Sequence, residues 1–202
     1  MKKEITWFLI RLISGLFRLL PHGRAVALGG YLGAVLWFFS RNRVDRAEKR
    51  AVRALGLGVT IARKIVRGSY ENLGRAVAEM SRLPWMLNRL DKFITFHGED
   101  NLTRAIEKGK GVIFLTSHMG NWEMLAAQVS AKGYPMNAIG AEQRDRRITD
   151  LIFEIRKKCG VKTISKGFDL KSAIRCLKRG EILGVLIDQD VRDKGIVVPF
   201  LG

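Results

Sequence analysis

Cysteine and histidine are scarce in this 202-residue chain. Cys159 and Cys176 match no metal or redox spacing, so we expect reduced thiols, with the cytosolic side of a membrane as their natural setting. The only histidines are His22, His97 and His118, which argues against a histidine-rich metal site. Repeats and low-complexity linkers are also missing.

Acidic residues are too few to balance the basic ones: 19 Asp and Glu against 36 Lys and Arg give a net charge of +17. Charge on this scale indicates a polyanionic partner, which could be nucleic acid, an anionic membrane surface or a phosphorylated substrate. The hydrophobic content of 47% excludes a disordered basic tail. The basic residues are spread along the chain, so the charge belongs to the fold.

No apolar run reaches the roughly 20 residues that cross a bilayer comfortably. Residues 5–20 are apolar but contain Arg11 and Arg18, which favours an amphipathic helix at a membrane interface. Residues 25–39 carry no charge over fifteen positions and could form a short or tilted span, a re-entrant helix or a buried hairpin partner. The internal arginines and the lack of a small-residue cleavage site argue against a signal peptide.

A basic cluster follows the uncharged run, offset only by Asp45 and Glu48. A basic cluster beside an apolar segment is typical of the anionic cytoplasmic leaflet, so we expect membrane association. A purely intramolecular helical hairpin is the alternative. The cluster consists of Arg41, Arg43, Arg46, Lys49, Arg50 and Arg53.

Strand and helix patterns alternate in the second half of the chain, which predicts an α/β fold with a largely parallel sheet. Residues 1–90 are expected to form a helical, membrane-anchoring region, with a helical pattern over 44–90 that ends near Pro84, and residues 91–202 the α/β domain. Helices are predicted at 101–108, 121–132, 146–158 and 170–178. Strands or extended segments are predicted at 93–96, 112–116, 135–141, 161–164 and 182–187.

The segment from Ser117 to Glu123, with the sequence SHMGNWE, follows the apolar strand pattern of residues 112–116. His118 therefore lies where a strand ends and a helix begins, a usual position for chemistry in open α/β sheets. A turn through Gly120 could let the Glu123 carboxylate reach the imidazole, which gives a base and a group that orients it. The alternative is a packed histidine and a glutamate favoured in the first turn of a helix.

Other polar residues fall at the ends of predicted strands. Arg144 and Arg147 open a helix after a strand, where phosphate binds readily, and Arg156 lies further along that helix. Asp188, Gln189 and Asp190 follow the strand at 182–187, at the sheet edge where His118 is expected. A solvated helix start and an exposed turn are the alternatives.

These motifs resemble those of the lipid A biosynthesis (Kdo2-lipid IVA) acyltransferases, within the lysophospholipid acyltransferase superfamily. The H-x4-E motif with Gly-Asn-Trp between its ends resembles the lipid A branch more than the glycerolipid branch. Asp188-Gln189-Asp190 together with residues 195–202 resembles the family's D-Q…G-x-x-V-P-F-x-G block, and the arginine-containing helix resembles its intervening segment. Family members usually continue past this block, which suggests a truncated chain.

The resemblance implies a membrane-associated enzyme at the cytoplasmic face of a bacterial inner membrane. His118 would act as the base and Glu123 would orient it, while Asn121, Arg144, Arg147, Arg156, Asp188 and Gln189 would bind or shape the substrate. Acyl carrier protein would deliver the acyl group as a thioester, a phosphorylated glycolipid would accept it, and anionic lipids would contact the protein. No metal or cofactor is implied.

Three alternatives remain open from the sequence. The acceptor could be another glycolipid or a lysophospholipid. The protein could be a non-catalytic, basic membrane-surface or nucleic-acid-binding protein, although no nucleic-acid recognition motif is present. The chain could also be a truncated relic without activity.

Overall fold

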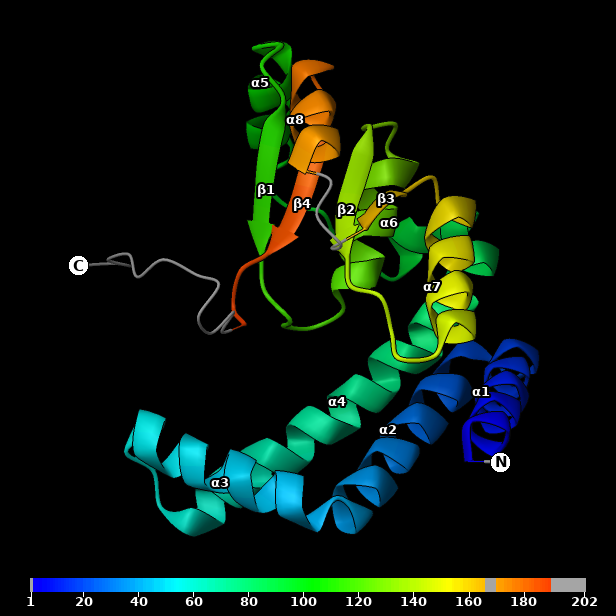
Figure 1. Cartoon of the computed structure of the whole chain (residues 1–202), viewed down its shortest axis with the longest axis vertical. Coiled ribbons are helices and arrows are strands. Elements are labelled where there is room, and N and C mark those ends of the chain that lie inside the picture. Colours follow the sequence, from blue (N-terminus) through cyan, green and yellow to red (C-terminus); the bar gives the residue numbers. More distant parts are fainter. Residues whose placement is uncertain (1, 166–169, 190–202) are drawn as a thin grey trace.

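The computed structural model of the chain describes residues 2–165 and 170–189 (Figure 1). Asp190 and the 195–202 block, both used in the sequence comparison above, lie outside these described residues. The elements run from four helices into alternating strands and helices.

Four helices form the first part of the fold: α1 (Lys2–Leu19), α2 (His22–Phe39), α3 (Arg41–Leu55) and α4 (Val59–Met86). Pro21 stands directly before α2, and Gly56, with a φ of +63°, ends α3 in the left-handed conformation that glycine adopts readily. Helix α4 runs beside α2 and at its far end reaches helices that pack on the sheet (Figure 1). Helix α4 thus connects the charged α3 to the helices beside the sheet.

Glycines bring α2 and α4 into close contact. A Cβ atom added at Gly29 would lie 2.5 Å from the carbonyl oxygen of Gly74 and 2.9 Å from Cβ of Ala78. A Cβ at Gly74 would in turn overlap the backbone of Gly29, and one at Gly33 would overlap the backbone of Tyr70. Because backbone is present on both sides of the contact, the helices could admit a larger residue only by moving apart.

Replacing Gly74 by alanine is therefore expected to destabilise the protein, although alanine favours helix. Overpacking of this kind costs typically about 1–3 kcal/mol of the free energy of unfolding. Gly68 lies on the same helix with open space around its Cβ position, so Gly68→Ala is a matched control that should stabilise by about 0.5–1 kcal/mol. Denaturant unfolding in detergent would measure both; equal stability of the two variants would contradict the close packing.

No single described helix is long and apolar enough to cross a membrane by itself. The pair His22–Phe39 and Arg41–Leu55, bent by 94° at their junction, passes the same test of length and composition together. Many apolar side chains are nevertheless exposed on the first helices, among them Phe8 and Leu19 on α1 and Phe39 on α2.

The sheet contains four described strands, all parallel, in the order β1-β4-β2-β3. They are β1 (Val112–Thr116), β2 (Met136–Gly140), β3 (Lys162–Ser165) and β4 (Ile182–Leu186). Strand β4, the last of the four along the chain, lies between β1 and β2. The predicted α/β fold with a parallel sheet is confirmed.

Helices cover both faces of the sheet. Leu102 of α5 (Glu99–Glu107), Met124 of α6 (Trp122–Ala131) and Ile155 of α7 (Arg146–Lys158) share one apolar cluster with Ile182 of β4. The next residue on β4, Leu183, points to the other face and packs against α8 (Leu170–Lys178). Because successive side chains on a strand point to opposite faces, β4 contributes apolar residues to the helix layers on both faces of the sheet.

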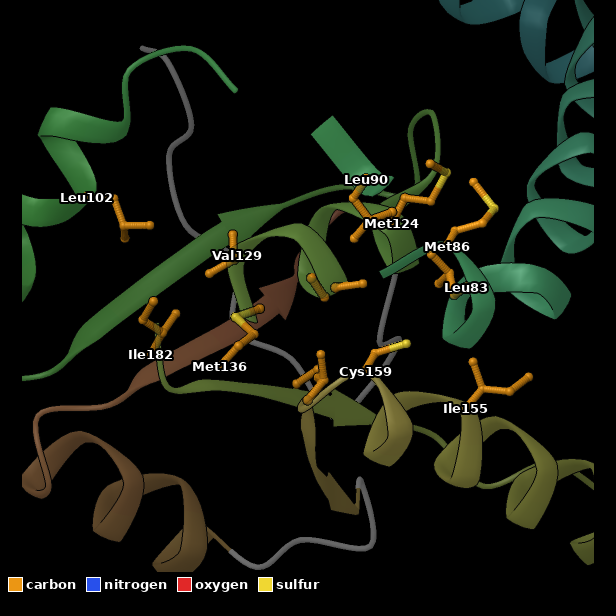
Figure 2. Close-up of a cluster of buried hydrophobic side chains, with 14 residues drawn as sticks. Leu83, Met86, Leu90, Leu102, Met124, Val129, Met136, Ile155, Cys159 and Ile182 are labelled. Carbon is orange, nitrogen blue, oxygen red and sulfur yellow. The ribbon is translucent and has the colours of Figure 1, made fainter. Parts of the chain in front are cut away.

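The main hydrophobic core continues from the sheet into the helical region. Leu83 and Met86 of α4 and Leu90 of the short 3-10 helix η1 (Leu87–Lys92) pack with Met124 and Val129 of α6 (Figure 2). The boundary expected near residue 90 therefore lies inside a shared core, which ties α4 to the helix that follows His118.

One predicted local feature was wrong. Residues 93–96 form no strand: Phe93 is a turn after η1, and Ile94 and Phe96 pack against the core without a strand partner. Apolar side chains can be buried without joining a sheet, so residues 93–96 satisfy the strand pattern without forming a strand. The predicted end of the helical pattern near Pro84 is confirmed, since α4 ends at Met86 with Pro84 in its last turn.

Candidate active site

His118 lies two residues beyond the end of β1, in the turn that leads to α6 (Figure 1). Gly120 has a φ of +63°, a conformation that side-chain-bearing residues rarely adopt, and it reverses the chain between the strand and the helix. The turn leaves the His118 side chain one-third exposed. The imidazole is therefore anchored by rigid elements and still open to solvent.

Asp188 holds the imidazole in place. Thr116 of β1 is paired in register with Leu186 of β4, so the residues two positions further along, His118 and Asp188, come side by side. His118 Nδ1 lies 2.8 Å from one carboxylate oxygen of Asp188, and the backbone N–H of His118 donates to the other at 2.9 Å. These hydrogen bonds, first from the ring and then from the backbone, lower the pKa of the Asp188 carboxyl below its ordinary value.

The contact with Asp188 selects the tautomer of the histidine. An ionised carboxylate can only accept, so Nδ1 carries the proton and donates it, which leaves the lone pair of Nε2 available as a base. The amide nitrogen of Gln189 lies 3.4 Å from Nε2, and the ring of Trp122 meets the imidazole edge-on at 4.8 Å between centroids. The predicted convergence of Asp188 and Gln189 on His118 is confirmed.

Glu123 is paired with Arg156 in this structure. The guanidinium donates to the two carboxylate oxygens at 2.9 and 2.6 Å, and the indole N–H of Trp122 donates to one of them at 3.2 Å. Both charged side chains are only 11% exposed. The expected contact between Glu123 and the imidazole is not formed, because the first turn of α6 directs the carboxylate toward α7 while β4 supplies Asp188 to the histidine.

The guanidinium of Arg156 crosses the end of β2 at Gly140. A Cβ atom at Gly140 would lie 2.7 Å from Arg156 Nη1, so the glycine leaves room for the guanidinium to cross the strand. The buried ion pair thus joins α6, α7 and β2 at the carboxyl edge of the sheet.

A small, largely apolar pocket, partly open to solvent, adjoins the ion pair. Its walls are formed by α6, by Arg156 of α7 and by residues of β1, β2 and β4. Trp122, which contacts the imidazole, also lines it. The lining residues are Phe114, Thr116, Trp122, Glu123, Leu125, Ala126, Met136, Ala138, Arg156, Gly184 and Leu186.

Asn121, expected to bind substrate, is engaged within the protein. Its carbonyl oxygen accepts from the backbone N–H of Met124 at 3.1 Å and caps α6. Its amide nitrogen donates to Glu79 of α4 at 2.8 Å and lies 3.4 Å from the carbonyl oxygen of Ala76. Sequence reasoning missed Glu79, since no local pattern links it to a turn 42 residues later.

The two other arginines lie apart from this arrangement. Arg147 donates to Asp145 and, at 2.7 Å, to Glu4 of α1, and its guanidinium stacks over the ring of Trp7. Arg144 is exposed. The contacts of Arg147 connect α7 to α1 and include neither His118 nor the buried ion pair.

Neither cysteine forms a disulfide: Cys159 and Cys176 are free and buried, as expected. Burial raises the pKa of the Cys159 thiol to about 11, so it is not a reactive thiolate. Across residues 2–165 and 170–189, no three His, Cys, Asp or Glu side chains come together in a way that could hold a metal ion.

Comparison with known proteins agrees with these motifs. The chain is 26% identical over 193 residues to the lipid A biosynthesis palmitoleoyltransferase of Escherichia coli K12 and, equally, to the lipid A biosynthesis acyltransferase of Shigella flexneri. The match covers 95% of this chain and 62% of each relative, so the chain spans less than two thirds of their length. A family model described as bacterial lipid A biosynthesis acyltransferase matches residues 1–202. The chain therefore belongs to the bacterial lipid A biosynthesis acyltransferase family.

Proposed function

We propose that the protein transfers a fatty acyl group from an acyl-carrier-protein thioester to a hydroxyl of a phosphorylated lipid A precursor. The observation that carries the proposal is the His118–Asp188 contact at 2.8 Å, in which the carboxylate accepts from Nδ1–H and so leaves Nε2 as an accessible base. Family membership and the names of the relatives support the choice of acyl transfer and of a lipid A acceptor.

The proposed reaction uses one proton transfer in each direction. Nε2 of His118 takes the proton of the acceptor hydroxyl while the oxygen attacks the thioester carbonyl carbon. The tetrahedral intermediate collapses, the carbon–sulfur bond breaks, and the imidazolium returns the proton to the departing sulfur. Asp188 stabilises the transient imidazolium, since it stays ionised at neutral pH.

The pocket beside Trp122 is proposed to hold the first carbons of the acyl chain. Its lining is mainly apolar, and it lies next to the residue that contacts the base. The Glu123–Arg156 pair would close one wall and keep the strand ends and α6 in register around the reacting thioester. Backbone N–H groups near Gly120 or the guanidinium of Arg156 would stabilise the oxyanion.

The protein is proposed to act at the cytoplasmic face of a bacterial inner membrane, in contact with anionic lipids. The net charge of +17 and the exposed apolar side chains of α1 and α2 support this placement. Arg144 and Arg147, at the start of α7, are candidates for the acceptor phosphates; Arg147 would then exchange its contact with Glu4 for a phosphate.

The test is acyl transfer in washed membranes that contain the protein. Labelled acyl-acyl carrier protein and a tetra-acylated, phosphorylated lipid A precursor are expected to give a penta-acylated product, detected by mass spectrometry. Acyl-CoA as donor, and a lysophospholipid or a dephosphorylated precursor as acceptor, should react more slowly. Transfer to the lysophospholipid alone would overturn the proposed acceptor, and no transfer to any acceptor would contradict the proposed activity.

A further inference from the structure

Helix α6, which carries Trp122 and Glu123, is hydrogen-bonded near both ends to helices outside the sheet. At its start, Asn121 donates to Glu79 of α4 at 2.8 Å. Near its end, the fully buried Gln128 donates to Asp91 of η1 at 2.7 Å. Its position is therefore set by the helical region as well as by the strands.

Glu79 and, more distantly, the Ala76 carbonyl oxygen accept from the nitrogen of the Asn121 amide. The carbonyl oxygen of Asn121 must face the helix to accept from Met124, and its nitrogen must then face α4. A carboxylate can only accept hydrogen bonds, so Glu79 admits this orientation and excludes the flipped one. If the amide flipped, its oxygen would face a carboxylate and its nitrogen the N–H of Met124, and both hydrogen bonds would be lost.

Among the described residues, Glu79 has no cationic partner. Within residues 2–165 and 170–189, no Lys, Arg or His forms an ion pair with it, although the protein carries an excess of 17 positive charges. The residue is partly buried, and Asn121 is the group that hydrogen-bonds its carboxylate. In the part of the chain that the structure describes, the contact of the Glu79 carboxylate is therefore the one with Asn121.

We propose that Glu79 is a positioning residue for acyl transfer, which acts through the amide of Asn121 on the turn that carries His118. Asn121 lies three residues after His118 and immediately before Trp122, whose ring contacts the imidazole. The inference rests on the proposed acyltransferase function. It places part of the control of the base on helix α4, outside the sheet domain.

Exchanging the amide of Asn121 and the carboxylate of Glu79 tests the proposal. Asn121→Asp keeps an oxygen to cap α6 but sets two carboxylates against each other, and we expect kcat to fall at least tenfold with little change in KM for the acyl donor. Adding Glu79→Gln supplies an amide that donates to the carboxylate introduced at position 121, and the double variant is expected to return to within about threefold of wild type. Glu79→Gln alone should lower kcat only a few-fold.

The pH dependence separates this role from a merely structural one. In Asn121→Asp, binding of one proton by the facing carboxylates relieves their repulsion, so the ratio of its activity to that of wild type should rise as pH falls from about 8 to about 6. The double variant should show a constant ratio. Asp91→Asn, at the other end of α6, keeps an acceptor for Gln128 and serves as the control with near wild-type transfer.

Amide hydrogen exchange over residues 118–125 gives a readout that does not need activity. We expect faster exchange in Asn121→Asp and recovery in the double variant. Absence of transfer by the wild type would contradict the proposed function, while exchange would still report on the contact. A double variant as impaired as Asn121→Asp at every pH, with exchange not restored, would overturn the proposal, as would full activity of Asn121→Asp.

Discussion

Replacing His118 by alanine is expected to lower the rate of acyl transfer by about 10²–10⁴, the usual contribution of a positioned general base. The reason is geometric: Nε2 is the side-chain atom that the Asp188 contact leaves ready to accept a proton at the edge of the sheet. The measurement is kcat for transfer from acyl-acyl carrier protein to the lipid A precursor, at saturating acceptor.

Two controls show whether the lower rate of His118→Ala reflects loss of the base rather than loss of the fold. The His118 side chain is one-third exposed, and exposed charge pairs contribute little to stability, so thermal unfolding and membrane attachment should stay close to wild type. Asp188→Asn keeps the shape but not the acceptor-only character of its partner, so it should also lower kcat by disturbing the tautomer. Transfer undiminished in His118→Ala would rule out His118 as the base.

Removal of one partner of the Glu123–Arg156 pair is expected to give the largest loss of stability. Arg156→Met leaves the Glu123 carboxylate, only 11% exposed, without its cation. Breaking a buried ion pair in this way costs about 3–5 kcal/mol, because the remaining charge is desolvated and uncompensated. The measurement is the free energy of unfolding from denaturant titration in detergent.

The double variant Glu123→Leu/Arg156→Met distinguishes the ion pair from the packing of its side chains. It removes both charges and should recover most of the lost stability. The exposed pair Arg67–Glu71 is a matched control on α4, where Arg67→Met should cost no more than about 0.5 kcal/mol. Equal destabilisation by the single and double variants would show that lost packing, rather than unpaired charge, is responsible.

The same double variant should not regain acyl transfer. In the proposed mechanism the ion pair lines the pocket that receives the thioester, and two apolar side chains would restore the fold but not the guanidinium. Recovery of both stability and activity would show that the pair serves the fold alone.

Local patterns in the sequence predicted much of the α/β part. Strand β1 and helices α7 and α8 have the predicted bounds, because an apolar run or a helical repeat there is closed by turn residues. Residues 93–96 were mistaken for a strand because four apolar and β-branched residues satisfy the same pattern. Whether such a segment pairs with a neighbour depends on strands elsewhere in the chain.

The candidate site was predicted in its position but not in its partners. His118 at the end of β1 and Asp188 at the end of β4 follow from strand ends alone. Their hydrogen bond required β4 to lie beside β1, which is a matter of strand order and register. The same fold turned Glu123 toward Arg156 and brought Glu79 to Asn121, and neither pairing has a local signal.

The sequence by itself determined the class of fold, the excess of positive charge and the candidate catalytic residues, since these depend on residue type and on spacing along one chain. Only the tertiary structure decided which carboxylate meets the imidazole, which cation neutralises Glu123 and which helix holds Asn121. Each of these contacts joins segments at least 33 residues apart. Such contacts are selected by the packing of the whole core, because a side chain reaches only the partner that the buried surfaces bring within a few ångströms of it.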